Sequence, residues 1–394
     1  MPSQILHTLF GEDFIGELYR RIDKRFALAA EKALKRITVH YRSAFVLGCQ
    51  GPDIFYHSQR TRPVALEYGS LLHRRGYGVF TATLLKMGLP DPPPDEEDIR
   101  AGRREKGINA LGVYALGFMT HAVLDRYCHP YIVYKSTPVA AKDSDDALQD
   151  DDAAGEAGPG MALGRAAHPF FERILDVLML KRLRNQDIST WDQAGTLAAV
   201  CENPPLGLKE LLARSLTAAF PERAGKDAKL VQRIDNAFLD AAYFYKITAP
   251  GYTAAGIGTG DAGGVATPAG VDFPSLVYVY PENLPSDIDF LNLGHERWCY
   301  PAGDFAEDRR SFPDIYAGAL RGAVDSLVPC IGEYLATGVF PIAAAARRIG
   351  NSGLSVTDGQ GRPCAPQRTR PLPLGAVLEG QARLRGIGPR SAGQ

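Results

Sequence analysis

Apolar side chains recur every three to four residues along most of this 394-residue chain, which is the pattern of helices that bury one face. Six segments show this period, namely residues 12–37, 69–88, 96–127, 168–183, 227–247 and 311–335. The alternation typical of strands is nearly absent, apart from a short LVYVY run that begins at Leu276. The pattern predicts an all-α protein built as a multi-helix bundle.

Three stretches interrupt the helical period. Between Lys135 and Gly160, seven acidic residues stand against two lysines, and from Gly251 to Gly270 seven of twenty residues are glycine. From residue 350 onward the chain is rich in Arg, Pro and Gly. Such compositions bury too little apolar surface to order themselves. We expect one all-α domain over residues 1–345 with an acidic loop insert at 136–163 and a Gly-rich segment at 251–272, followed by a disordered tail at 350–394.

Charge and composition restrict the class of protein. Lys plus Arg number 44 against 45 Asp plus Glu, so no overall positive field favours binding of long nucleic acids. No apolar run reaches the 18 residues of a membrane span, and the N-terminal residues lack the pattern of a signal peptide, so we expect a cytoplasmic protein. The six scattered cysteines form no CxxC pair and are expected to be reduced thiols.

Histidines beside carboxylates are the most informative feature of the chain. In GFMTHAVLDRYCHP, His121, Asp125 and His129 follow one another at intervals of four residues and form one stripe on a helix. His121 and His129 would lie about 12 Å apart along the helix axis, so Asp125 between them could serve two ions. Alternatively, the helix ends at His129, just before Pro130.

A second pair, His168 and Glu172, has the four-residue spacing with which helices bind metal ions. His7, Asp53 and His73 are further candidates nearer the N-terminus. Burying so many ionisable groups among apolar neighbours would cost several kcal/mol unless a metal ion compensated them. The remaining histidines, by contrast, are expected to be ordinary structural residues: His40, His57 and His295.

Five motifs occur in a fixed order: LHTLFG, LGCQGPDIFY, GSLLHRRG, GFMTHAVLDRYCHPYI and HPFFERILD. In combination they resemble the zinc-dependent phospholipase C family over roughly residues 1–250 and again in the FLNLGHERWCYP and SFPDIYAGA segments. The resemblance implies an all-α domain whose helices enclose two or three zinc ions and which hydrolyses phosphodiesters. It further implies a ligand assignment in which one zinc ion is held by Asp53, His73, His121 and Asp125, a second by His129, His168 and Glu172, and a third by His7 with Asp125 as a bridge.

Phosphodiester hydrolysis suits such a ligand set. Zinc ions about 3.5–4 Å apart lower the pKa of bound water toward ~7 and clamp the attacking and leaving oxygens. Asp53 is the candidate for general base or for orienting the water. The expected substrate is a phospholipid or a small phosphodiester, and peripheral membrane contact through the Arg-rich tail is a further hypothesis. Two alternatives stay open: a nuclease or nucleotidase of the same fold, and a catalytically silent, metal-stabilised binding protein.

Overall fold

A computed structural model describes residues 4–22, 27–89, 108–139, 163–249, 273–385 and 387 of the chain. This part is mostly helical, as the hydrophobic period predicts. The α-helices are α1 (Gln4–Arg21), α2 (Ala27–Lys35), α3 (Arg42–Cys49), α4 (Leu66–Arg74), α5 (Tyr77–Gly88), α7 (Ala110–Ser136), α8 (Ala167–Arg184), α9 (Gln193–Glu202), α10 (Leu208–Ala219), α11 (Leu230–Ile247), α13 (Phe312–Thr337), α14 (Ile342–Ile349) and α15 (Leu374–Leu384).

Short elements connect these helices. A π-helical turn, η2 (Arg36–His40), precedes α3, and the 3-10 helices are η3 (Gly51–Phe55), η4 (Gly164–Ala166), η5 (Ile188–Thr190), η6 (Ala224–Lys226) and η7 (Phe273–Tyr278). Strands β1 (Trp298–Cys299) and β2 (Glu307–Asp308) form a small antiparallel pair that the sequence pattern did not predict. The LVYVY run begins within η7 and is not a strand.

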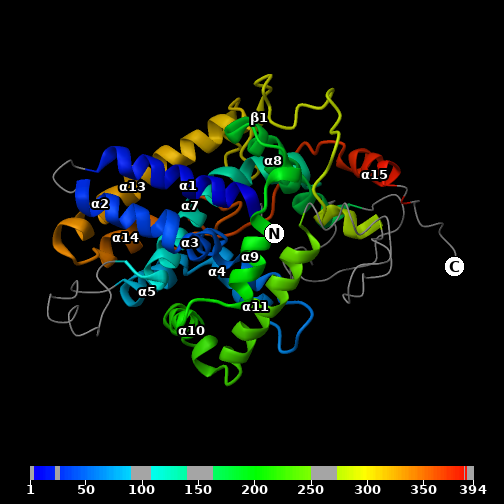
Figure 1. Cartoon of the computed structure of the whole chain (residues 1–394). Coiled ribbons are helices and arrows are strands. Elements are labelled where there is room, and N and C mark those ends of the chain that lie inside the picture. The colour runs from blue at the N-terminus through cyan, green and yellow to red at the C-terminus, as the bar shows by residue number, and fades with distance from the viewer. Residues whose placement is uncertain are drawn as a thin grey trace.

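Helix α7 lies at the centre of the bundle. It packs against α3, α13, α5, α1 and α8, and Figure 1 shows it between α1 and α13 on one side and α3 and α5 on the other. A helix enclosed in this way must be apolar around most of its circumference, and α7 buries residues on every side. The helix also continues past Pro130 to Ser136, which corrects the alternative that it ends at His129.

Two glycines bring α3 and α7 into backbone contact. A Cβ atom on Gly48 would lie 2.2 Å from the carbonyl oxygen of Tyr114, and one on Gly117 would lie 2.5 Å from that of Phe45. Since any side chain at either position would separate the helices, the glycines fix the spacing between α7 and the η3 turn that follows α3.

The C-terminal region corrects the prediction of a disordered tail from residue 350. Residues 350–385 are described, Leu354 is fully buried in the main core, and α15 contributes Leu374 and Leu378 to the same core. Composition misled the sequence analysis because the few apolar side chains of this region, among them Leu354 and Val377, are buried in the core, while arginines such as Arg362, which pairs with Asp358, remain at the surface. The predicted acidic insert and Gly-rich segment lie outside the described residues, except for residues 136–139 and 163.

None of the described helices combines the length and apolar character that crossing a membrane requires. All six cysteines are free, as expected from their scattered positions.

Candidate metal centre

The structure brings all eight predicted ligands together from five elements. His7 comes from α1, Asp53 from η3 and His73 from α4, while α7 and α8 supply the others. Their ligand atoms form three groups within which all atoms lie within 4.8 Å of one another: His7, His121 and Asp125; Asp53, His73 and His121; and His129, His168 and Glu172. Two groups share His121 and form a connected half; the third group shares no ligand with them and is called the separate half, although its His129 Nδ1 lies 3.7 Å from Asp125 Oδ2.

Asp125 lies at the middle of the connected half. Its Oδ1 atom is 3.2 Å from His7 Nε2, and its Oδ2 atom is 3.1 Å from His121 Nε2 and 3.7 Å from His73 Nε2. The two oxygens of one carboxylate therefore face different imidazoles, which is the arrangement of a bridging ligand. The side chain is also nearly buried, so these contacts are weakly screened by water.

Asp53 reaches the same half from a turn that only glycine allows. Gly51 has a φ of 57°, and a Cβ atom there would lie 2.3 Å from Cγ of His121. The turn places Asp53 Oδ1 3.1 Å from His73 Nε2 and Oδ2 4.0 Å from His121 Nε2. Gly51 is therefore a cradle for the His121 ring, a role that the sequence analysis missed.

The separate half joins α7 to α8. Glu172 Oε1 lies 3.4 Å from His129 Nε2 and 3.2 Å from His168 Nε2. His168 is the most exposed ligand, with 21 % of its side chain accessible, whereas His121 is fully buried. Access from solvent to the centre is therefore greatest at the α8 end.

Main-chain carbonyls orient three of the imidazoles. The Nδ1 atom of His73 lies 2.8 Å from the Gly69 carbonyl oxygen, that of His121 lies 3.2 Å from Cys49, and that of His129 lies 3.0 Å from Leu354. A carbonyl only accepts, so each Nδ1 carries a proton, and in the neutral imidazole each Nε2 offers a lone pair toward the ligand groups.

Burial and charge set the protonation of these groups. Burial alone would raise the pKa of Asp125, but the charges of His121 and His129 outweigh it and hold that pKa well below the usual carboxyl range. Burial lowers the pKa of His121 and of His168, which favours the neutral imidazole that binds metal. Burial also acts to lower the pKa of His129, but Asp125 and Glu172 outweigh it and raise that pKa to about 9.

Unpartnered buried atoms indicate that the residues fit a metal ion. His121 Nε2 and Asp125 Oδ2 are buried, lie 3.1 Å apart, and have no hydrogen-bond partner. Two donors bound to one tetrahedral zinc ion, with bonds of about 2.0–2.1 Å, lie about 3.3 Å apart. The buried His, Asp and Glu groups could therefore hold metal ions at the spacing that their donor atoms already have.

Asp176 lies one helical turn after Glu172 on α8, but it contacts α1 and belongs to none of the ligand groups found among the described residues. Its carboxylate accepts hydrogen bonds from the backbone N–H groups of Ile5 and Leu6 at 3.3 and 2.8 Å. A carboxylate at a helix N-terminus satisfies donors that have no intrahelical partner. Asp176 thus anchors the beginning of α1 to α8 and thereby positions His7 near Asp125.

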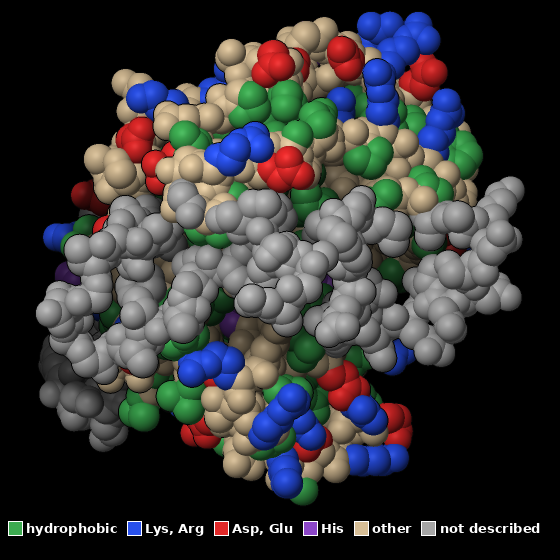
Figure 2. All heavy atoms as spheres, turned by 90° about the vertical axis from the view of Figure 1, so that its right-hand side faces the viewer, with side chains coloured by type: hydrophobic (Ala, Val, Ile, Leu, Met, Phe, Trp, Pro, Cys, Tyr) green, Lys and Arg blue, Asp and Glu red, His purple; other side chains and the backbone are tan. Residues whose placement is uncertain are grey.

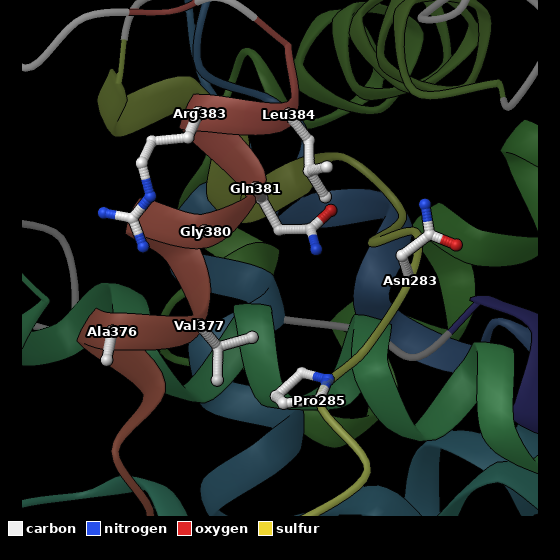
Figure 3. Close-up of a pocket in the computed structure, with 8 residues that line it drawn as sticks. All are labelled: Asn283, Pro285, Ala376, Val377, Gly380, Gln381, Arg383 and Leu384. Carbon is white, nitrogen blue, oxygen red and sulfur yellow. The ribbon is translucent and has the colours of Figure 1, made fainter.

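The face of the molecule in Figure 2 carries side chains of both charges. Figure 2 shows Lys and Arg side chains interspersed with Asp and Glu, and histidines only as small patches. A hollow of about 480 Å³ lies between α15 and the loop at Asn283 and Pro285, and Figure 3 shows Val377, Gln381 and Leu384 lining it. None of the residues that line this hollow is one of the eight ligands.

His40, His57 and His295 belong to none of the ligand groups found among the described residues. His57 is buried against Phe244, with ring centroids 4.0 Å apart, and neither of its ring nitrogens has a hydrogen-bond partner. Burial lowers the pKa of His57 from 6.5 to about 3, so its imidazole is neutral in the folded protein.

Replacing His57 with phenylalanine should therefore change how stability depends on pH. Between pH 6.5 and 3 the unfolded chain binds a proton at His57 that the folded chain does not, so wild-type stability falls as pH falls. The loss is about 1.4 kcal/mol per pH unit, or about 2 kcal/mol from pH 6.5 to pH 5. Urea unfolding at pH 7 and pH 5 should show the His57→Phe variant gaining this amount relative to wild type. His40→Phe, at an exposed position, is the control, and parallel pH curves for wild type and His57→Phe would contradict the expectation.

Comparisons of the chain with protein family models, with curated proteins and with solved structures found no match.

Proposed function

We propose that this protein is a zinc-dependent hydrolase of phosphate esters, acting as a phosphodiesterase of the phospholipase C type. The observation that carries the proposal is the buried Asp125 carboxylate, whose Oδ1 faces His7 while its Oδ2 faces His121 and His73, as a carboxylate that bridges two ions would. Shared ligands place ions close together, and paired ions are typical of enzymes that cleave phosphate esters. The resemblance of the five sequence motifs to zinc-dependent phospholipases C supports the same conclusion.

The ligand chemistry favours a catalytic rather than a structural centre. All donor atoms are imidazole nitrogens or carboxylate oxygens, and structural zinc sites usually contain thiolates. Bound divalent ions would supply Lewis-acid activation of water and of the phosphoryl group. In each group three protein side chains contribute, which leaves room for water or substrate at a four-coordinate ion.

This chain's own residues would hold and orient the reacting groups. Asp53 approaches His73 with one carboxylate oxygen at 3.1 Å, while its second oxygen lies 4.0 Å from His121. Burial alone would raise the pKa of Asp53, but His121 and His73 outweigh it and lower that pKa, so the carboxylate stays ionised at neutral pH. Asp53 is therefore proposed to accept a proton from, or to orient, the attacking water.

The test combines metal content with turnover. We expect two or three zinc ions per chain in freshly purified protein and hydrolysis of p-nitrophenylphosphorylcholine. Because His121 belongs to two ligand groups, the His121→Ala protein should lose bound metal. Its kcat/KM should fall by more than about 100-fold, because losing even a residue that only hydrogen-bonds to a ligand can cost about 100-fold. His40→Ala, which alters an exposed histidine, should behave as wild type.

The same assay separates the competing functions. Turnover of 3′-nucleotides in preference to the phosphorylcholine ester would move the proposal to a nucleotidase. Bound zinc without turnover of either substrate would favour the metal-stabilised binding protein. Absence of bound metal from the purified wild-type chain, even after incubation with zinc, would refute the proposal.

A further inference from the structure

The C-terminal segment at residues 349–356, which we call the strap, touches both halves of the candidate metal centre. The backbone N–H of Leu354 donates to the carbonyl oxygen of His73 at 2.8 Å. The carbonyl oxygen of the same residue accepts from His129 Nδ1 at 3.0 Å. One residue therefore contacts a ligand of the connected half and a ligand of the separate half, although it lies 225 positions after His129.

The contact with His73 satisfies a group that α4 leaves open. His73 lies in the last turn of α4, where carbonyl oxygens have no intrahelical partner. Leu354 supplies the missing donor, and its own side chain is fully buried in the main core. The strap therefore caps the C-terminal turn of α4, the helix that carries His73.

Arg126, the residue after Asp125, holds the strap in place. Its guanidinium donates to the carbonyl oxygens of Gly350 at 3.3 Å and Ser352 at 2.9 Å. It also donates to Gly353 at 3.4 Å and to Ile349. A cation at these carbonyls also interacts favourably with the C-terminus of α14, which ends at Ile349.

A further contact fixes the strap to a neighbouring helix. The side-chain oxygen of Asn351 accepts a hydrogen bond from the backbone N–H of Val79 at 3.1 Å, in the first turn of α5. The strap is thus held from α5 and from α7 on either side of the position at which it meets His73 and His129.

We propose that the strap is part of the metal centre, with Leu354 orienting the His129 imidazole through its carbonyl oxygen and Arg126 acting as the positioning residue that holds Leu354 there. This inference rests on the proposed function only in requiring that the three ligand groups bind metal. Outer partners of metal-bound imidazoles fix ring orientation and raise ligand basicity, and losing one costs about 10–100-fold in metal affinity. The effect is expected to be largest at the group formed by His129, His168 and Glu172.

The experiment compares the full-length protein with Arg126→Ala and Arg126→Lys. Zinc affinity is measured by competition with a chromogenic chelator, and the Co²⁺-substituted proteins are compared by their visible absorption spectra. We expect Arg126→Ala to weaken binding of the ion held by His129, His168 and Glu172 by about 10–100-fold and to alter the Co²⁺ spectrum. Arg126→Lys retains the positive charge and part of the hydrogen bonding, so it should restore part of the affinity.

Arg348→Ala is the matched control. The Arg348 guanidinium also donates to main-chain carbonyl oxygens, those of Asp325 and Ser326 at 3.3 and 2.8 Å, but these carbonyls belong to α13. Its metal affinity and Co²⁺ spectrum should match those of wild type. A folded Arg126→Ala protein with wild-type affinity and spectrum would overturn the inference while leaving the proposed function intact.

A measurement on the wild-type protein decides the matter if Arg126→Ala does not fold. In ¹⁵N-histidine-labelled protein loaded with Zn²⁺, the inference expects His129 to carry its proton on Nδ1 and to bind metal through Nε2. Metal binding through Nδ1 would overturn the inference, because that atom would then be unable to donate to Leu354. A wild-type chain that binds no zinc would refute the proposed function and the inference together.

Discussion

Replacing Asp125 with alanine is expected to abolish the connected half of the metal centre. Its two carboxylate oxygens lie 3.2 Å from His7 Nε2 and 3.1 Å from His121 Nε2, with two further imidazoles at 3.7 Å, so the substitution leaves four imidazoles without a shared anion. We expect metal content to fall by at least one ion per chain. We expect kcat/KM for the phosphodiester to fall by at least about 1000-fold, which exceeds the 10–100-fold loss typical of removing a group that only hydrogen-bonds to a ligand.

Asp125→Asn separates charge from shape, since the amide has nearly the volume of the carboxylate. It should lose metal almost as completely as Asp125→Ala, because an amide carries no negative charge to bridge two cations. Asp240→Asn is the matched control, as Asp240 is a buried carboxylate that accepts from the backbone N–H groups of Arg60 and Thr61 at 2.9 Å. The Asp240→Asn protein should be less stable than wild type but should bind the same amount of metal. Full metal content in both Asp125 variants would show that this residue is not a ligand.

Removing the bound metal is expected to lower the melting temperature substantially. An ion present at 1,000 times its Kd stabilises the folded state by about 4 kcal/mol, so two ions contribute about 8 kcal/mol. For a chain of 394 residues, this amounts to a fall of about 10 °C in Tm upon exhaustive chelation. Differential scanning calorimetry with and without chelator measures the shift.

The choice of ion added back provides the control for the chelation experiment. Zn²⁺ should restore the original Tm, whereas Mg²⁺ should not, because Mg²⁺ prefers oxygen ligands and five of the eight candidate ligands are histidines. The His121→Ala protein, which lacks a ligand of two groups, should show a smaller shift on chelation. Equal melting temperatures for wild type in zinc and in chelator would indicate that metal does not stabilise the fold.

Five of the eight candidate ligands were predictable because their spacing is local, whereas His7, Asp53 and His73 stand alone in the sequence. His168 and Glu172 lie one helical turn apart, and so do His121 and Asp125, so helix geometry alone places each pair on one face. A helical stripe of ionisable groups inside an apolar segment is costly to bury unless something compensates the charges. A bound metal ion provides such compensation, so the stripe indicates a metal site. Spacing alone does not distinguish Asp176 from a ligand, because the distinction depends on the N-terminus of α1, which lies 170 positions away in sequence.

The contacts between the strap and the candidate ligands could not be predicted, because they join distant parts of the chain through backbone groups. Leu354 acts through its amide and carbonyl groups, which every residue except proline possesses, so its identity gives no signal. The guanidinium of Arg126 donates to carbonyl groups more than 220 positions away, which no local sequence pattern indicates. Pro130 suggested the end of a helix, but α7 continues because the turns after it are buried against neighbouring elements.

The distance in sequence between the ligands and the strap bears on when metal is acquired during synthesis. All eight ligands have been translated by residue 172, but the carbonyl oxygen that orients His129 comes about 180 residues later. At 5–20 residues per second, the ribosome needs about 10–40 s more to reach it. During this interval a nascent chain displays its histidines without the group that fixes their geometry. If the centre binds metal as proposed, its geometry is completed only after residue 354 has been synthesised.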